Sequence, residues 1–306
     1  MSLIGFDKIK AKLIDSYQQN RLHHAILLNG KSGIGKASFA KEFAFEILGA
    51  KNENHPDLFL IEKEEGKKEI SVEKIREISK FLNQTSAISK NKFIIIDSAD
   101  ELNRSSSNAL LKILEEPHNN NFLILISHSI SKLLPTIRSR CQIVKINDLN
   151  FEDFTKVLHD THPKFLPKIP DDKIKILSEI CDNSPAKAIS EGDDVIWLYS
   201  SLLNSLKNKI IDGELLKKIG EKNFNFENFS KIINFFFLRL AKYYSGQIDY
   251  FLFEEKEIFQ HLKNKFSIEE IFAIDSEVKS QIAKTASLNL DKKLTLINIF
   301  NQIRCR

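Results

Sequence analysis

Cysteine is scarce in this 306-residue chain, and its three cysteines, Cys141, Cys181 and Cys305, lie far apart. An odd number without a Cys-x-x-Cys pair argues against a disulfide framework and offers no cluster for a tetrahedral zinc site. No apolar run approaches the length of a bilayer span, and the N-terminus has no signal-peptide pattern. We therefore expect a cytoplasmic protein with no membrane contact and no bound metal.

Glycine and proline are also few, and neither charge sign dominates. The chain has 10 glycines, 7 prolines, 42% apolar residues and 28% charged residues, which is an ordinary composition for a helix-rich globular protein. At this length, two or three domains are expected. The net charge of +4 is only mildly basic, so it neither demands nor excludes nucleic acid as a partner.

Short apolar runs alternate with helical patterns in the first half of the chain. The runs are 25–29, 58–61, 93–96, 122–126 and 142–146, and the helical patterns are 1–20, 36–48, 71–83, 101–116 and about 130–138. Continuous apolar strands between helices are typical of a parallel sheet that helices cover on both faces. The pattern predicts an α/β domain over residues 1–148, with Ser71 as the N-cap of its third helix.

After residue 147 the strand pattern stops and the sequence becomes helical. Residues 151–192 predict a small helical unit with a loop through His162-Pro163, Pro167 and Pro170. Farther on, apolar residues recur at helical spacing from Phe229 to Leu240, and Ser267 with Glu270 forms a capping box. We expect a small helical lid over 149–195 and an all-helical C-terminal domain over 196–306.

Residues 30–37 contain a phosphate-binding loop that is present but incomplete. Gly30, Gly35 and Lys36 fit the pattern G-x-x-x-x-G-K-[ST], but Ala37 stands where a hydroxyl should hold Mg²⁺. The glycines, including Gly33, allow backbone N–H groups to face a phosphate at a helix N-terminus. The loop favours a nucleotide-binding fold and argues against a competent NTPase, because the metal loses one protein ligand.

Two strand ends carry polar residues that fit the same type of site. Asp97 ends an apolar run at the position that orients Mg²⁺, but Ser98 follows it, where active relatives of this architecture have a water-activating Glu. Asp97 could also merely end a buried strand. The run 122–126 leads into Ser127-His128-Ser129, where a small hydroxyl could sense a nucleotide γ-phosphate, although polar strand ends are common.

Two arginines, Arg138 and Arg140, precede the last apolar run, within Ser139-Arg140-Cys141. They could be ordinary surface charges. An arginine is also the residue that stabilises a transferring phosphoryl group from a neighbouring subunit.

Two motifs together resemble a known family. Asn108-Ala-Leu-Leu-Lys-Ile-Leu-Glu-Glu-Pro117 followed by Ser139-Arg140-Cys141 closely resembles the clamp-loader subunits of bacterial DNA polymerase III. The resemblance is strong over 22–147, weaker over 151–192 and only suggestive over 205–306. It implies a P-loop AAA+ domain with a five-stranded parallel sheet, a small helical lid, and a helical collar domain that forms oligomers.

The departures from the motor pattern indicate which group of these subunits the chain resembles. Ala37, Ser98 and Ala186 replace the metal-binding hydroxyl, the activating acid and a nucleotide-sensing arginine, whereas the motif around Arg140 is intact. This combination resembles the delta-prime group, which implies a stator without ATPase activity whose Arg140, flanked by Ser139 and Cys141, acts on a neighbouring subunit. Residual weak binding of ADP or ATP stays open, with Gly30, Gly33, Gly35, Lys36 and Asp97 as the binding residues.

The same resemblance implies absences, partners and rivals. Many family members bind zinc through four cysteines after the second helix, but this chain has none between Leu48 and Asp57, so we expect no zinc. The implied partners are gamma/tau and delta subunits, the sliding clamp indirectly, and primer-template DNA.

Lys74 and Arg104, at two helix N-termini, are candidate DNA contacts, unless they are solvated charges. The rival functions are a gamma/tau-like ATPase with degenerate motifs and a stand-alone replication regulator.

Overall fold

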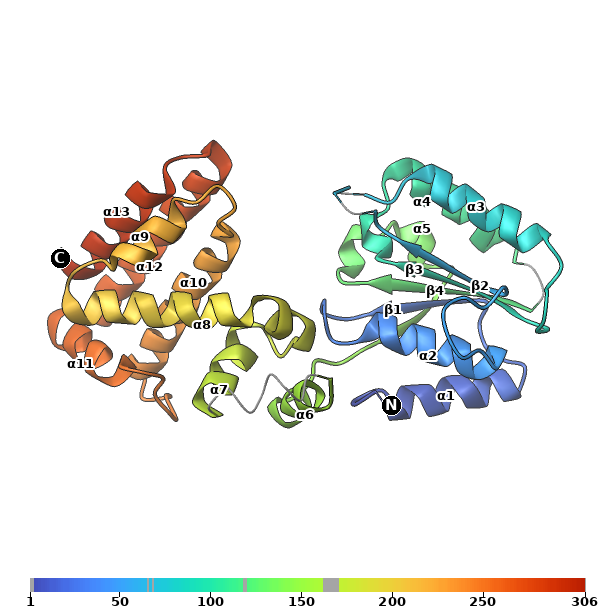
Figure 1. Cartoon of the computed structure of the whole chain (residues 1–306), viewed down its shortest axis with the longest axis horizontal. Helices are drawn as coiled ribbons and strands as arrows, with labels where there is room; N and C mark the ends of the chain where they lie inside the picture. Colours follow the sequence, from blue (N-terminus) through green and yellow to red (C-terminus); the bar gives the residue numbers. More distant parts are fainter. Residues whose placement is uncertain (1–2, 65, 68, 118–119, 162–170, 306) are drawn as a thin grey trace. The chain divides into compact units, whose positions relative to one another are not determined.

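The chain forms two compact units, which are described separately. The computed structural model describes residues 3–64, 66–67, 69–117, 120–161 and 171–305. Residues 1–157 with 184–186 make up the α/β unit, and residues 158–183 with 187–306 make up the helical unit. Figure 1 labels most elements of both units.

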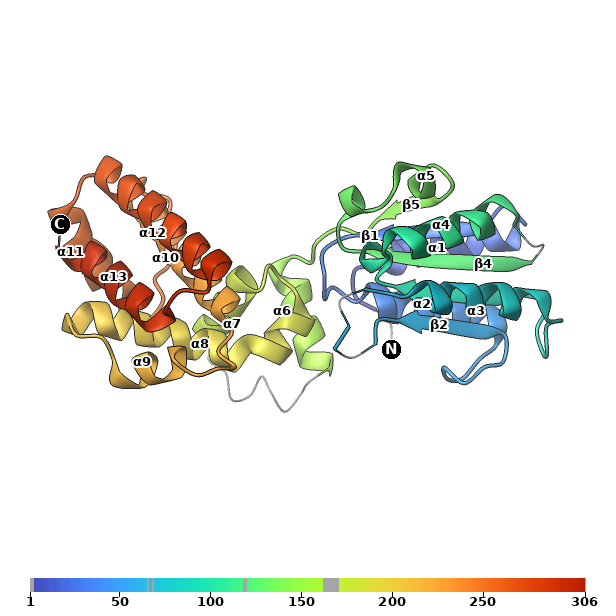
Figure 2. The same ribbon diagram turned by 90° about the horizontal axis from the view of Figure 1, so that it is seen from above.

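The α/β unit contains a five-stranded parallel sheet in the order β2-β3-β4-β1-β5. Figure 2 labels four of these strands, β5, β1, β4 and β2, in the order of the sheet. Their bounds are β1 Ala25–Asn29, β2 Leu58–Glu62, β3 Lys92–Asp97, β4 Asn121–Ser127 and β5 Gln142–Lys145. The predicted number, direction and position of the strands are confirmed.

Helices cover both faces of this sheet, which explains why its strands are apolar throughout. In β1, Ala25 and Leu27 pack toward one face, whereas Ile26 and Leu28 pack toward the other, as strand periodicity requires. Figure 1 shows α1 and α2 on one face and α3 and α4 on the other. The bounds are α1 Asp7–Gln18, α2 Lys36–Leu48, α3 Val72–Asn83, α4 Arg104–Glu115 and α5 Pro135–Arg138, with 3₁₀ turns η1 Ala99–Glu101 and η2 Ile130–Lys132.

Some predicted element boundaries differ from the observed ones. The expected helix 101–116 begins at Arg104, because the side chain of Asn103 caps it by accepting a hydrogen bond from Ser106 N. The expected helix 130–138 is split before Pro135, since the residue preceding a proline avoids helical geometry. Ser71 occupies the predicted N-cap position of α3, but its side chain makes no capping hydrogen bond.

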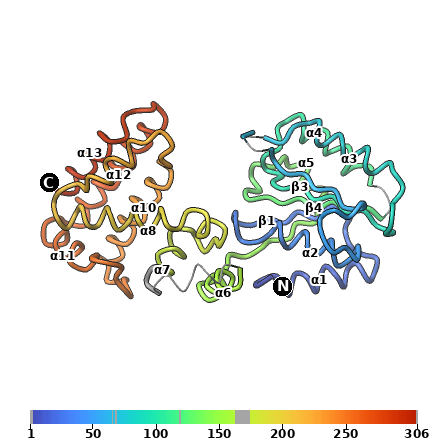
Figure 3. The backbone as a smooth tube through the Cα atoms, in the orientation of Figure 1, coloured from blue at the N-terminus to red at the C-terminus, as the bar shows by residue number. Residues whose placement is uncertain are grey.

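The helical unit continues to the end of the described chain (Figure 3). Its bounds are α6 Phe151–Thr161, which begins in the α/β unit, α7 Asp171–Ile180, α8 Pro185–Asn208, α9 Gly213–Ile219, α10 Phe226–Tyr244, α11 Glu255–Lys265, α12 Ile268–Leu288 and α13 Lys292–Cys305. Helix α8 runs without interruption across residue 195, the expected border between lid and collar, so the division into three domains stays a prediction. The loop expected through His162 and Pro170 lies outside the described residues.

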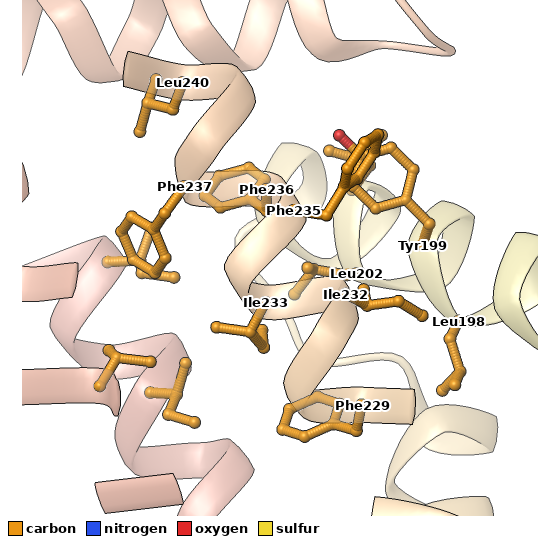
Figure 4. Packing of buried hydrophobic residues seen from close by; sticks show 14 of the residues in the cluster. Leu198, Tyr199, Leu202, Phe229, Ile232, Ile233, Phe235, Phe236, Phe237 and Leu240 are labelled. Atoms are coloured by element: carbon orange, nitrogen blue, oxygen red, sulfur yellow. The ribbon is translucent and has the colours of Figure 1, made fainter. Parts of the chain in front are cut away.

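One apolar cluster forms the core of the helical unit, and α10 contributes its largest part. The residues predicted from their spacing are all buried: Phe229, Ile232, Ile233, Phe236, Phe237 and Leu240. Figure 4 shows them packed with Leu198, Tyr199 and Leu202 of α8. The predicted capping box is also confirmed, since Ser267 Oγ accepts from Glu270 N while the Glu270 carboxylate accepts from Ser267 N. No helix in the described ranges is long and apolar enough to span a membrane.

Candidate functional site

The phosphate-binding loop lies between the end of β1 and the start of α2, as its motif requires. Gly33 and Gly35 have φ angles of +76° and +97°, which side chains rarely adopt, so glycine is needed at both positions. A Cβ atom on Gly30 would lie 2.8 Å from the carbonyl oxygen of Ile146. The conformation of the loop therefore requires the glycines of the motif, although the motif is incomplete at Ala37.

The ammonium group of Lys36 is bound by groups of its own domain. Its side chain is almost fully buried, and Nζ donates to the carbonyl oxygens of Gly30 at 2.7 Å and Lys31 at 2.5 Å. The third partner is His128 Nδ1, at 2.9 Å. Burial lowers the pKa of Lys36 from 10.5 to about 8, and the carboxylates of Asp97 and Asp100 partly oppose this shift.

His128 extends these contacts to the end of β3. Its Nε2 atom lies 2.7 Å from Ser98 Oγ, which donates to Asp97 Oδ1 at 2.9 Å. The backbone N–H of His128 donates to Asp100 Oδ1 at 2.9 Å. Burial, followed by the nearby Lys36 charge, lowers the pKa of His128, so the imidazole is neutral at pH 7. The side chains of Lys36, His128, Ser98 and Asp97 form one chain of contacts, called the lysine network below.

The groups around this loop do not fit a Mg²⁺–nucleotide complex. Ala37 lies in the first turn of α2, and its methyl group packs against the apolar cluster beneath that helix. Asp97 accepts a hydrogen bond from Ser98 instead of facing an activating acid. Ala186 N donates to the Gly33 carbonyl oxygen at 3.3 Å, so this position reaches the loop through its backbone and without a charge. The network supplies neither a metal-binding hydroxyl nor a base for water.

The role of a hydroxyl at the end of β4 in sensing a phosphate stays a prediction. Ser127 is fully buried, and its Oγ accepts from the backbone N–H of Ser129 at 3.2 Å. The neighbouring residue His128 contacts Lys36 instead. Sequence reasoning missed His128 because an isolated histidine at a strand end gives no signal until the topology sets β4 between β3 and β1.

The second candidate region is the motif Ser139-Arg140-Cys141, which lies between α5 and β5. Arg140 Nη2 forms a 2.9 Å ion pair with Glu115 Oε1 at the end of α4, and Nη1 donates to the Thr136 carbonyl oxygen at 3.1 Å. The Arg140 side chain is 38% exposed. This pairing joins the two motifs that carry the family resemblance, but no spacing rule in the sequence would have found it.

The neighbours of Arg140 hold the backbone around it. Ser139 Oγ donates to the Thr136 carbonyl oxygen at 3.0 Å, which closes the last turn of α5. Cys141 packs against the apolar cluster beneath α4, and burial raises the pKa of its thiol to about 12. The Cys141 thiol is therefore an apolar anchor at neutral pH and not a reactive group.

The two candidate regions lie at opposite ends of the parallel strands β1 and β5, which are neighbours in the sheet. Gln142, at the start of β5, pairs with Ile26, whereas the phosphate-binding loop begins only after the end of β1. Because a strand rises about 3.3 Å per residue, the start of β5 is on the order of 13 Å from that loop along the strand direction. Arg140, two residues before β5, thus lies at the N-terminal end of that strand, whereas Lys36 lies beyond the C-terminal end of β1.

The helix N-termini proposed to contact DNA do lie together. The segments before α3 and α4 form an isolated parallel bridge between Ile70 and Leu102, and Ser106 Oγ donates to the Ile70 carbonyl oxygen at 2.7 Å. Arg104 is exposed in the first turn of α4. Lys74 donates to the carbonyl oxygen of Glu62 at 2.8 Å and lies 3.5 Å from the carboxylate of Glu64. A role for Lys74 and Arg104 in DNA binding stays a prediction.

The metal-binding potential of the chain can be stated for the part of it that the structure describes. There, no group of three or more His, Cys, Asp or Glu residues is arranged to hold a metal ion. Cys141 and Cys181 are free thiols. The expected absence of zinc stays a prediction.

Fold and site together define a class of protein: an α/β domain with a phosphate-binding loop and a helical C-terminal region, in which Ala37 and Ser98 stand where the groups for Mg²⁺ and water activation are expected. The family model described as "DNA polymerase III, delta subunit" matches residues 5–150. Over this domain the chain is similar to delta-prime subunits of DNA polymerase III.

Individual relatives include both types of subunit. The DNA polymerase III subunit delta' of Pseudomonas aeruginosa is 41% identical over 39% of this chain and 41% of its own length. The subunit gamma of Buchnera aphidicola from Schizaphis graminum is 31% identical over 67% of this chain and 60% of its own length. The chain thus matches less than two thirds of either relative.

One solved structure is similar over nearly the whole chain. A gamma subunit-related protein of Thermotoga maritima has a TM-score of 0.53 at 21% identity and covers 98% of both chains. At this identity, the similarity supports the fold alone.

Proposed function

We propose that this chain is a non-hydrolysing clamp-loader subunit that supplies Arg140 to the nucleotide site of a neighbouring gamma/tau-type subunit. In this proposal it assembles with gamma/tau and delta subunits and acts when the sliding clamp is placed on primer-template DNA in the cytoplasm. Its own loop takes no part in hydrolysis. The similarity to delta-prime and gamma relatives supports the assembly, and the replaced groups around Lys36 support the loss of hydrolysis.

The observation that carries the proposal is the position of Arg140 before the start of β5, whereas Lys36 follows the other end of the neighbouring strand β1. The pairing of Gln142 with Ile26 keeps the guanidinium away from a nucleotide in its own loop. The side chain is nevertheless 38% exposed, and an ion pair with Glu115 and a hydrogen bond to the Thr136 carbonyl oxygen hold it. This arrangement supports a role of Arg140 on a phosphate that another molecule binds.

The chemical role of Arg140 would be electrostatic. Charge spreads over the γ-phosphate oxygens during phosphoryl transfer, and a guanidinium in a partly dry interface stabilises that charge without reorganising. In related NTPases an arginine supplied in this way is worth roughly 10³–10⁵ in rate. Ser139 and Cys141 would fix the backbone that carries Arg140 and would not touch the phosphate.

The test is reconstitution of the loader with Arg140→Ala, followed by measurement of DNA-stimulated ATP hydrolysis. Turnover should fall by roughly 10³-fold while assembly and folding stay intact. Arg76→Ala, which removes an exposed arginine from α3, is the matched control and should leave turnover unchanged. Unchanged turnover with Arg140→Ala in a fully assembled loader would remove the proposed role.

The rival function is a gamma-like ATPase, which the 31% identity with a gamma relative favours. The two functions differ in the behaviour of the isolated chain. Under the proposed function, a purified preparation free of other loader subunits should not raise the rate of ATP hydrolysis above that in buffer alone. Turnover comparable with that of a motor subunit would favour the rival, and failure to co-purify with loader subunits would favour a stand-alone regulator.

A further inference from the structure

In the lysine network each side chain donates a hydrogen bond to the next one, from Lys36 to Asp97. Lys36 can only donate, so His128 Nδ1 must be the acceptor of their 2.9 Å contact. The neutral imidazole then carries its proton on Nε2 and donates it to Ser98 Oγ. Ser98 in turn donates to Asp97 Oδ1. Every donor meets an acceptor, so the network links the phosphate-binding loop to the end of β3 through β4.

This network uses the full donor capacity of Lys36. An ammonium group has three N–H donors, and the three acceptors within reach are Gly30 O, Lys31 O and His128 Nδ1. A phosphate could reach Nζ only by displacing at least one of them. The imidazole cannot simply turn away, because its Nε2–H would lose Ser98 and its backbone is tied to Asp100.

We propose that His128 is an internal substitute for the phosphate of a nucleotide: it binds the P-loop lysine to the end of β3 and thereby excludes nucleotides from this chain. The domain then keeps one arrangement of loop and sheet whether or not ATP is present. The inference concerns the isolated chain, so it can fail while the trans role of Arg140 stands, and the reverse also holds.

A simpler explanation of weak binding would be the missing metal ligand at Ala37. The two explanations separate when Mg²⁺ is removed, because a missing metal ligand then has no effect on binding. The probe is ADP carrying a fluorescent N-methylanthraniloyl group, titrated into the isolated chain in EDTA. The variants are His128→Ala and the double variant His128→Ala/Lys36→Met, and the matched control is His159→Ala on the exposed face of α6.

The parent and His159→Ala should bind the probe only weakly. His128→Ala should bind at least about tenfold more tightly, because the freed ammonium gains a charge-assisted hydrogen bond to phosphate. Adding Lys36→Met should return binding to the parent level. A folded His128→Ala variant that binds no more tightly than the parent would overturn the proposal, and so would tight binding that survives Lys36→Met.

A second measurement uses the unmodified protein and does not depend on how a variant folds. Long-range ¹⁵N–¹H spectra of the histidine rings should show His128 as a neutral imidazole protonated on Nε2 at pH 7. Its signals should not move when ADP is added at concentrations below the millimolar range. An Nδ1-protonated ring, or signals that shift with such ADP, would show that His128 does not hold Lys36.

Discussion

Arg239 in the helical unit and Arg140 in the α/β unit both pair with a glutamate, but their surroundings differ. The side chain of Arg239 is 2% exposed, and its partner Glu255 is fully buried. Arg239 donates to both carboxylate oxygens of Glu255, at 2.6 and 2.7 Å, and to the Tyr250 carbonyl oxygen at 2.7 Å. Arg140 is 38% exposed, and its partner Glu115 is 50% exposed.

This difference separates an arginine fixed within a core from one that is free to change partners. Removing one member of a buried pair leaves a charge without compensation, which is strongly destabilising. An exposed pair contributes little, since solvent and salt screen both charges. A side chain that is to reach a neighbour's phosphate must be exposed and weakly paired, as Arg140 is.

The largest expected effect is the loss of Arg239. In Arg239→Met, the free energy of unfolding of the helical unit should fall by roughly 3–5 kcal/mol, because Glu255 stays buried without its partner. Trp197, the single tryptophan of the chain, packs against the core of this unit and reports its unfolding in urea by fluorescence.

The double variant Arg239→Met/Glu255→Leu is the control, because it removes both charges. It should recover part of the lost stability, since well-packed apolar residues can replace a buried ion pair. If Arg239→Met were as stable as the parent, burial would not distinguish the two arginines.

The next effect concerns Lys36, a buried cation of the α/β unit. The pKa of Lys36 is about 8 in the folded protein, whereas an ordinary solvated lysine, as in the unfolded chain, has a pKa of 10.5. Between these pH values the unfolded chain therefore binds more protons at this residue than the folded one. The contribution of Lys36 to stability should therefore rise from pH 8 to 10.5, by up to about 3 kcal/mol. The measurement is the free energy of unfolding of the parent minus that of Lys36→Met across this range.

The reference for this series is Lys12→Met, on the exposed face of α1, which accounts for general alkaline effects. A parent-minus-variant difference that stays constant from pH 8 to 10.5 would mean that Lys36 is solvated. In that case Lys36 would be as accessible to solvent as Arg140, and the contrast between a buried Lys36 and an exposed Arg140 would not hold.

The sequence predicted the fold well, because each signal was local and periodic. Continuous apolar runs predicted all five strands, and helical spacing predicted the buried face of α10. The breaks at Asn103 and before Pro135 were missed, since a cap and a proline shift a boundary by only a few residues.

The candidate site was predicted less completely. The glycines, Lys36, Asp97 and Arg140 came from motifs. By contrast, the contacts of His128 with Lys36 and of Glu115 with Arg140 join residues that only the tertiary fold brings together.

A smaller effect is expected for Arg104 and Lys74 at the helix N-termini beside η1. If both contact the DNA backbone, Arg104→Ala/Lys74→Ala should make the salt dependence of loader binding to primed DNA less steep by roughly two units. The loss should be similar for different DNA sequences, because phosphate contacts carry no sequence information. Arg76→Ala is the control. If the parent and the double variant bound DNA with equal affinity and equal salt dependence, Arg104 and Lys74 would be surface charges without a role in DNA binding.

The smallest effect should come from Glu115→Gln, which removes the only carboxylate paired with Arg140 among the described residues. Because both side chains are exposed, the free energy of unfolding should fall by less than about 1 kcal/mol, and added salt should abolish the difference. Glu116→Gln, the exposed neighbour, is the matched control. Under the proposed function, loader turnover should change by far less than with Arg140→Ala, since a released arginine would still reach a neighbour's phosphate. If Glu115→Gln slowed turnover as much as Arg140→Ala, the pair would position Arg140 rigidly, as Glu255 does Arg239.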